Sequence, residues 1–516
     1  MLSKVIESIS PEALHSKQIY VITRFFCGCL DDQSFLKEIL IGLKCVSAND
    51  ELSSYSIPSL IDKYDFSPIN TKKDIIDMLS FCMETYSPDV IETYIIQIWN
   101  MLKNEIFEKS DDDLVKKSLD CLFIISKVFS QEISKNSENT SLIKFLTPIS
   151  DEINKHFEEP GTKTAKNSIK ILYSLSSASK YAFELLFEHC IPSLLSRFEK
   201  EDSINTKAAI LEFISFFLLS ALYVYNSYNK EINEGIPINS ILMKEKNRLF
   251  TILSNSLTTP FFSNKYTRAA AIHALLTFSE IHSLLQYDEV KLIVQYFNDI
   301  VLKEENNLKA EALEALVKIA ETKPNLILET TFSSFLKLLS ETDSATISNN
   351  CSLPLNEIIL TVLSHLCVEK QLFNIFISHI LNTFDIISDL KSNYLIALSY
   401  VIQNTPKHII LPELASVLPL LLQCFSLDDY KLKVSNINIL YIITLESSDL
   451  IIEHLGSLIP FLLTFSTEKH NNDINVQIAA LKCLGLFPTI LKTEFILPFK
   501  NTVIRKLVEV LDDPKR

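Results

Sequence analysis

Cysteines and histidines, ten of each, are the side chains of this sequence best suited to nucleophilic chemistry or metal binding. A structural zinc site needs four such ligands, often supplied as Cys-x2-Cys pairs, and no such pair occurs. Cys27 and Cys29 lie two positions apart, so on a helix they point to different faces, and we predict one buried and one half-exposed thiol. His189 precedes Cys190 without a third ligand nearby, which predicts ordinary packing. The sequence therefore predicts no metal site and no bound cofactor.

Phosphate-binding and nucleophile-bearing loops depend on glycine, and the chain has only 6 glycines. A phosphate loop reads Gly-x4-Gly-Lys-Ser/Thr, but around Gly161 the first glycine is replaced by His156 and the lysine by Thr162. No G-x-S-x-G or G-x-G-x-x-G sequence occurs. The acidic run from Asp111 to Asp113 stands at the start of a helical pattern, where carboxylates complement the helix dipole. We predict no catalytic residue and a protein that is not an enzyme.

The charge balance is acidic, with a formal net charge of −15 from 63 Asp and Glu against 48 Lys and Arg. A nucleic-acid-binding surface needs clustered cations that neutralise phosphates. Near the C-terminal end, Arg505 and Lys506 are followed by Glu509, Asp512 and Asp513, which predicts a solvated face of mixed charge. We therefore predict no direct nucleic-acid binding, and basic or mixed protein partners.

The cysteines are scattered singly through apolar patterns, which favours a reducing compartment, the cytosol or the nucleus. The first residues carry Lys4 and Glu7 and lack an apolar core, so we predict no secretory signal. The longest uncharged run, residues 213–229, barely reaches the length of a membrane span and ends in polar residues. We predict a buried helix there, and no association with a membrane.

The elements that hold these residues are predicted to be helices, because apolar residues recur at i, i+3, i+4 and i+7 nearly throughout. One type of segment opens with a polar turn and continues with apolar and small residues, whose Ala and Ser side chains let neighbouring helices approach closely. Such segments lie roughly 40 to 60 residues apart. They start at Asp112, Gly161, Asp202, Asn264, Asn306, Ser388, Asp428 and Asn472, with two more near Ser34 and Thr71.

A second type of segment lies between these and often begins with an apolar residue and proline, as at Pro192, Pro412, Pro460 and Pro498. Proline costs little near a helix start, where its missing N–H would be unpaired. Two helices per unit at this period are the signature of HEAT and armadillo repeats. We predict an all-α solenoid of about eleven helix pairs.

Three regions are predicted along this stack: N-terminal repeats in residues 1–130, middle repeats in residues 131–387 and C-terminal repeats in residues 388–516. The polar stretch of residues 225–244 lengthens one interval and predicts an exposed loop between two helices. Because each unit of a solenoid packs only on its neighbours, a long surface is left for partners.

Several segments go beyond a general repeat pattern. Residues 474–516, "INVQIAALKCLGLFP" followed by "ILPFKNTVIRKLVEVLDDPKR", and residues 391–440 resemble the C-terminal repeats of one large HEAT-repeat family. Residues 95–107 and 289–307 look like further segments of its C-terminal half, and residues 20–43 like a segment near its N-terminus. The family is the HEAT-repeat adaptor of the cytosolic iron–sulfur protein assembly (CIA) targeting complex, the nucleotide-excision-repair and transcription family of MMS nineteen type. That family is much longer, and its middle is missing here after about residue 60.

The resemblance implies a non-enzymatic adaptor, cytoplasmic and nuclear. Its implied partners are a cluster-carrying CIA component, a β-propeller CIA component, and the iron–sulfur apoproteins that receive clusters, such as DNA helicases, polymerases and primase. The scattered cysteines agree with a protein that holds no cluster itself, because cluster ligands are grouped. The alternative is another HEAT-repeat scaffold, such as a nuclear-transport receptor or a phosphatase scaffold.

The C-terminal repeats, residues 391–516, are predicted to carry the partner-docking surface, because the resemblance is tightest there and an uncapped solenoid end exposes apolar surface. The predicted contact residues are polar positions on otherwise apolar helices or at the final turn. They are Gln477, Lys482, Arg505, Asp512 and Asp513.

Overall fold

The computed structural model describes residues 15–30, 32, 34–46, 50–108, 111–131, 140–232, 240–258, 265–303, 306–341, 355–368, 370–383, 391–426, 430–467 and 474–511. Within these ranges the regular structure is helical and contains no strand. The all-α prediction is therefore confirmed. The helices belong to two compact units, residues 1–287 and residues 288–516.

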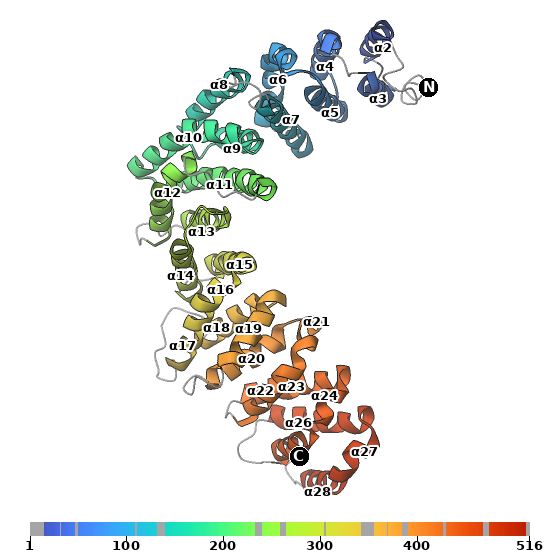
Figure 1. The fold of residues 1–516 in the computed structure, drawn as a ribbon, viewed down its shortest axis with the longest axis vertical. Coiled ribbons are helices and arrows are strands. Elements are labelled where there is room, and N and C mark those ends of the chain that lie inside the picture. The colour runs from blue at the N-terminus through green and yellow to red at the C-terminus, as the bar shows by residue number, and fades with distance from the viewer. Residues whose placement is uncertain are drawn as a thin grey trace. The chain divides into compact units, whose positions relative to one another are not determined.

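The first unit consists of two series of helices in alternation (Figure 1). Each helix of a series packs against the next helix of the same series. The first series is α3 (Leu36–Val46), α5 (Ile69–Thr85), α7 (Asp112–Gln131), α9 (Lys163–Ser176), α11 (Ile204–Ile232) and α13 (Lys265–Glu280). The second series is α2 (Ser16–Gly28), α4 (Ser53–Asp65), α6 (Pro88–Glu108), α8 (Thr140–His156), α10 (Lys180–Lys200) and α12 (Ile241–Thr258).

The second unit repeats this alternation. Its first series is α15 (Asn306–Thr322), α18 (Leu355–Leu366), α20 (Lys391–Asn404), α23 (Tyr430–Glu446) and α26 (Ile474–Ile490), again packed each on the next. The second series is α14 (Tyr287–Lys303), α17 (Ser333–Glu341), α19 (Lys370–Thr383), α22 (Leu414–Gln423), α25 (Leu455–Thr467) and α28 (Lys500–Leu511). The two units together place eleven first-series helices in the described ranges, which confirms the predicted solenoid of about eleven pairs.

Several second-series helices of this unit are preceded by a separate turn of helix. These are α16 (Pro324–Ile327), α21 (Lys407–Ile410), α24 (Ser448–Ile452) and α27 (Thr493–Ile496). Pro412 and Pro498 lie at the starts of the 3-10 turns that follow α21 and α27, as predicted for proline near a helix start. Pro192 and Pro460 differ from that prediction, because they lie inside α10 and α25.

Helix α7 illustrates why these segments are helical. Leu114, Leu122, Ile125 and Phe129 recur at helical spacing and are buried. The carboxylate of Asp111 accepts hydrogen bonds from the backbone N–H groups of Asp113 (3.1 Å) and Leu114 (3.0 Å), which caps the N-terminus. The acidic run is therefore a helix start, as predicted from the sequence.

Serine side chains link neighbouring first-series helices. Ser126 of α7 donates a hydrogen bond to the carbonyl oxygen of Leu175 in α9 (3.0 Å), and Ser174 donates to that of Leu119 in α7 (2.5 Å). Ser176 of α9 bonds to Ser220 of α11 (2.8 Å). A serine side chain is short, so its hydroxyl reaches the next helix only where the two backbones approach closely. This agrees with the predicted role of small residues in these helices.

The loop predicted at residues 225–244 is wrong at both ends. Helix α11 continues to Ile232 and α12 begins at Ile241, and residues 233–239 lie outside the described ranges. Tyr225 is fully buried. Asn226 donates to the carbonyl of Glu280 (3.3 Å) and accepts from the N–H of His282 (3.1 Å). These bonds hold the second half of α11 against the turn after α13.

The apolar part of α11 is long and hydrophobic enough to cross a membrane, with a mean hydropathy of 1.9 over its best window. It also packs against α9, α10 and α13, and 61% of that window is buried inside the structure. The predicted buried helix is confirmed. The predicted regional boundaries after residues 130 and 387 stay predictions.

Candidate docking surface in the C-terminal repeats

The last helices of the second unit form the structural frame of the predicted docking region. Helix α25 packs against both α26 and α28, and α27 contacts α26. Between α26 and α28 the chain turns through α27 and a 3-10 turn that contains Pro498. Proline lacks the N–H that a continuous helix would use, which agrees with a break at this point.

These helices border an apolar groove of about 350 Å³. The residues that line it come from all three long helices and from the turn between α26 and α28. They are Ile459, Leu484, Phe487, Pro488, Thr493, Ile496, Leu497, Lys500, Val503 and Ile504. Leu497 and Ile504 are 61% and 50% exposed, so the groove leaves apolar surface exposed.

The described lining of this groove is mostly apolar. Among the described residues that line it, Lys500 alone is charged and Thr493 alone carries a side-chain hydroxyl. Cys483, on α26 beside the groove-lining Leu484, is buried, and burial raises the pKa of its thiol to about 12. A thiol with this pKa stays protonated near neutral pH and is a poor nucleophile. The groove therefore presents apolar side chains, whose burial by a partner is favourable.

The predicted contact residues lie near the groove but do not line it. Gln477 is half-buried and Lys482 exposed on α26, and Arg505 is exposed on α28. Asp512 and Asp513 lie outside the described residues. The structure therefore does not gather the predicted set into one site. Their contact role stays a prediction.

Sequence reasoning missed the groove itself. Its lining residues are apolar and spread over residues 459–504, so they look like core positions in the sequence. The available signal was the apolar segment 495–504, "FILPFKNTVI", which leaves Leu497 and Ile504 exposed because no described helix covers them. The predicted contact residues were polar instead, although large apolar and aromatic side chains usually contribute most of the binding free energy.

The other candidate chemical groups are separate in the structure. Cys27 and Cys29 are both half-buried, so the predicted difference between them is wrong. Both lie at the C-terminal end of α2, where Cys29 is the residue that follows the helix. Cys190 is buried, whereas His189, which precedes it on α10, is exposed. No group of three or more His, Cys, Asp or Glu side chains that could hold a metal ion occurs in the described part of the chain.

Two segments of the chain match family models. Residues 387–488 match the MMS19 model described as "RNAPII transcription regulator C-terminal", and residues 43–108 match the MMS19 model described as "Dos2-interacting transcription regulator of RNA-Pol-II". Over these two segments the chain is similar to the MMS19 family. The first match runs from α20 into α26 and includes the groove residues from Ile459 to Pro488. The remaining groove residues follow it.

Curated MMS19 proteins are similar to parts of this chain. "DNA repair/transcription protein mms19" of Schizosaccharomyces pombe is 45% identical over 126 residues, 24% of this chain and 12% of that protein. A DNA repair/transcription protein of Saccharomyces cerevisiae from the same family is 33% identical over 146 residues, 28% of this chain and 14% of that protein. The human "MMS19 nucleotide excision repair protein homolog" is 23% identical over 225 residues, 43% of this chain and 21% of that protein. The chain thus spans only a small part of these relatives' length. Their names place the family in DNA repair and transcription.

Solved structures with a similar arrangement include karyopherins. Kap121p aligns over 96% of this chain and 51% of its own length, with a TM-score of 0.45 and 14% sequence identity. Yeast importin-β (Kap95p) aligns over 100% of this chain and 74% of its own length, with a TM-score of 0.38 and 13% identity. Values this low carry no argument about the function of this chain.

Proposed function

We propose that this chain is a non-enzymatic adaptor of the cytosolic iron–sulfur assembly targeting complex, acting in the cytoplasm and the nucleus. In this role it brings cluster-carrying machinery to apoproteins of DNA replication, repair and transcription, including helicases, polymerases and primase. The iron–sulfur cluster is cargo and is not a resident group of the chain. The observation that carries the proposal is the match of residues 387–488 to the C-terminal MMS19 model.

The proposed docking surface is the groove between α25, α26 and α28. Its partner is the cluster-carrying component, with the β-propeller component in the same assembly. Exposed Leu497 and Ile504 support this assignment, because large apolar side chains that are half or more exposed gain most from being covered. A pocket without a nucleophile–base pair supports binding rather than catalysis.

The proposed docking is tested with two variants of the full chain. Ile504→Asp places a carboxylate in the groove, whereas Ile478→Asp places one on α26 at a position that is 45% exposed and does not line the groove. We expect Ile504→Asp to weaken capture of the cluster-carrying component at least tenfold, since buried hot-spot residues contribute about 2 kcal/mol or more. We expect Ile478→Asp to bind like the unaltered chain. Equal binding of all three proteins would remove the groove from the proposal.

The assignment to this complex is tested separately. Affinity purification of the chain from its native cells, followed by mass spectrometry, is expected to recover the cluster-carrying and β-propeller components together. Recovery of a Ran-type GTPase or of phosphatase subunits in their place would assign the chain to a different class of HEAT-repeat scaffold.

A further inference from the structure

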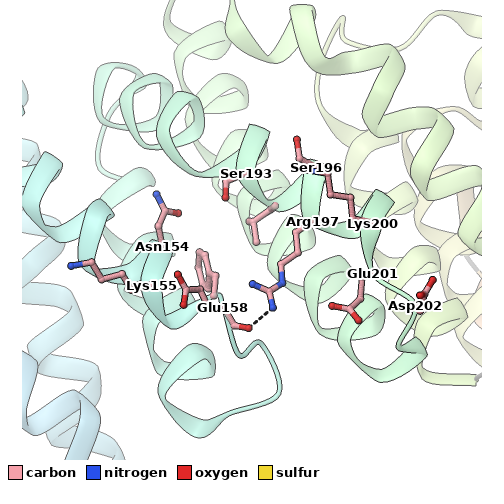
Figure 2. Close-up of a pocket in the computed structure, with 11 residues that line it drawn as sticks. Asn154, Lys155, Glu158, Ser193, Ser196, Arg197, Lys200, Glu201 and Asp202 are labelled. Atoms are coloured by element: carbon pink, nitrogen blue, oxygen red, sulfur yellow. Dashed lines mark hydrogen bonds between the residues drawn. The ribbon is translucent and has the colours of Figure 1, made fainter.

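A second pocket lies in the first unit, between the C-terminal ends of α8 and α10 (Figure 2). Its volume is about 670 Å³, within the range of pockets that bind ligands. One wall consists of Asn154, Lys155, Phe157 and Glu158, at the end of α8 and in the turn after it. The other wall comes from the end of α10 and the residues that lead into α11, and consists of Ser193, Leu194, Ser196, Arg197, Lys200, Glu201 and Asp202. Polar and charged side chains dominate both walls, unlike those of the C-terminal groove.

Arg197 lies at the centre of this pocket and is held in place by the protein. Its Nη2 donates a hydrogen bond to the backbone carbonyl oxygen of Glu158, on the opposite wall (Figure 2). The side chain is half-buried, and its Nε–H is enclosed without an acceptor. No carboxylate among the described residues forms an ion pair with it. The guanidinium is thus positioned but lacks a counter-ion.

The neighbouring arginine shows what a completed pair looks like. Arg248 of α12 donates through Nε (2.9 Å) and Nη2 (3.1 Å) to the two carboxylate oxygens of Glu199. Glu199 and Arg197 belong to the same helix, two residues apart. A two-bond pair of this kind is the strongest arrangement that an arginine and a carboxylate form. Arg197 has no such carboxylate acceptor among the described residues, and its Nη2 donates to a backbone carbonyl instead.

A half-buried charge without a counter-ion costs stability, and a group that supplies the opposite charge removes that cost. Sequences keep such unsatisfied groups mainly at functional sites. Of the carboxylates that line the pocket, Glu201 accepts a hydrogen bond from the N–H of Ser203 (3.1 Å). Glu158 and Asp202 are exposed. The pocket therefore has an unmet requirement for one carboxylate at Arg197.

The charged residues around Arg197 restrict the kind of ligand that can supply this carboxylate. Lys155 and Lys200 line the pocket together with Arg197, and Glu158, Glu201 and Asp202 balance them. A polyanion such as a nucleic acid or a polyphosphate would meet three carboxylates as well as three cations. A single acidic side chain within a peptide of mixed charge can pair with Arg197 alone. The carboxylates of Glu158, Glu201 and Asp202 then stay available to basic residues of the same peptide. The pocket volume also exceeds the need of one side chain and accommodates the adjoining peptide.

We propose that the pocket between α8 and α10 binds an acidic side chain in a peptide segment of a protein partner, through an ion pair with Arg197. Asn154 on the α8 wall and Ser193 on the α10 wall provide polar contacts for the peptide next to that side chain. This site is distinct from the C-terminal groove and does not depend on the proposed adaptor function.

The proposal is tested by ligand-observed NMR titration of the full chain with two blocked peptides, acetyl-Gly-Glu-Gly-amide and acetyl-Gly-Gln-Gly-amide. The peptides have the same shape and differ only in the charged group. We expect the Glu peptide to bind about tenfold more tightly than the Gln peptide, because a charge-assisted pair is worth more than a neutral hydrogen bond. Sodium acetate and inorganic phosphate are titrated in parallel and are expected to bind more weakly than the Glu peptide.

Two variants make the test specific to the pocket. Arg197→Gln is expected to abolish the preference for the Glu peptide. Arg248→Gln removes an arginine that does not itself line the pocket, although its Nη2 donates to the hydroxyl of the lining residue Ser196 (3.3 Å). It is expected to keep the preference, because Arg197 is unchanged. Circular dichroism establishes that both variants are folded. Equal binding of the two peptides to the unaltered chain, a preference that survives Arg197→Gln, or acetate or phosphate binding as tight as the Glu peptide would each overturn the proposal.

Discussion

At the scale of single residues, burial controls the reactivity of the cysteines. Burial raises the pKa of Cys82, Cys121 and Cys190 to about 12, whereas Cys29 and Cys45 are half-exposed. Thiolates, not thiols, react with alkylating agents. We expect iodoacetamide at pH 7.5 to label Cys29 and Cys45 in the folded chain and to leave the three buried cysteines unlabelled until urea is added. Peptide mass spectrometry measures each site. Labelling of Cys121 as fast as Cys45 would contradict this assignment.

A second residue-scale prediction concerns His156 at the end of α8. Burial lowers the pKa of this histidine below its usual value of 6.5, and its Nδ1 lies 2.8 Å from the hydroxyl of Ser168. The unfolded chain therefore binds a proton at higher pH than the folded chain does. The free energy of unfolding is expected to fall as the pH drops below about 6.5.

The measurement is the urea unfolding midpoint at pH 7.5 and at pH 5.5. In His156→Gln the titrating group is absent, so the difference between the two midpoints is expected to be smaller than in the unaltered chain. An identical difference in both proteins would show that His156 makes no contribution to the pH dependence.

At the scale of elements, one glycine controls how closely α2 and α3 pack. A Cβ atom placed on Gly42 of α3 would lie 2.3 Å from the Phe26 ring of α2, whereas one on Gly485 of α26 meets nothing within 4 Å. Gly42→Ala is expected to lower stability by about 1–3 kcal/mol through overpacking. Gly485→Ala, its control, is expected to raise it by about 0.5–1 kcal/mol, because alanine favours the helix. Denaturant unfolding measures both changes. A neutral Gly42→Ala would mean that Phe26 moves freely aside.

A partly buried ion pair joins α5 to α6. Nζ of Lys72 lies 2.6 Å from a carboxylate oxygen of Glu105, which is 6% exposed, and 4.7 Å from the Tyr64 ring centre. Lys72→Met removes the counter-ion of a buried carboxylate and is expected to destabilise by about 2–4 kcal/mol. The double variant Lys72→Met/Glu105→Gln is expected to lose less than the sum of the single changes. Additive losses in unfolding experiments would show that the pair is not coupled.

The same scale explains how far the sequence predicts the fold. First-series helices were predicted wherever a polar turn precedes a long amphipathic run. Helix α18 was missed, and the predicted series has a gap between Asn306 and Ser388, because α18 is short, with only 12 residues. The second half of α11 was assigned to a loop because its polar composition hides a tertiary contact. Asn226 hydrogen-bonds to the backbone carbonyl of Glu280 at the end of α13, 54 residues further along the chain. No local sequence pattern reveals such a contact.

The candidate sites show the same limit more strongly. The sequence predicted the C-terminal repeats as a docking region but did not predict the groove. The walls of the groove come from three helices, and in the sequence the apolar residues of each helix resemble ordinary core positions. The pocket at Arg197 was not predicted at all. Its walls are 39 residues apart at the Arg197–Glu158 bond, and an arginine in a helical pattern ordinarily indicates a solvated face. The missing counter-ion becomes visible only when the neighbouring helices are in place.

At the scale of the whole molecule, a stack of repeats allows terminal repeats to be removed without unfolding the others, because each repeat packs only on its neighbours. We expect a chain that ends at Lys391 to remain helical by circular dichroism and to lose the cluster-carrying component in a pulldown. The full chain with Arg505→Glu serves as a milder change, expected to weaken binding by about 1–3 kcal/mol. Undiminished capture by the shortened chain would place the docking surface before residue 391.

The alternation of the two helix series also bears on how this protein is made. Each first-series helix in the first unit packs against the next one along the chain, from α3 through α13, and those of the second unit do so from α15 through α26. No strand order has to be resolved within the described ranges. Each newly synthesised pair of helices can therefore settle on the pair before it as the nascent chain leaves the ribosome. Translation pauses near the ends of repeats are consequently expected to disturb folding less than pauses within a helix pair, whose apolar faces are uncovered until its second helix emerges.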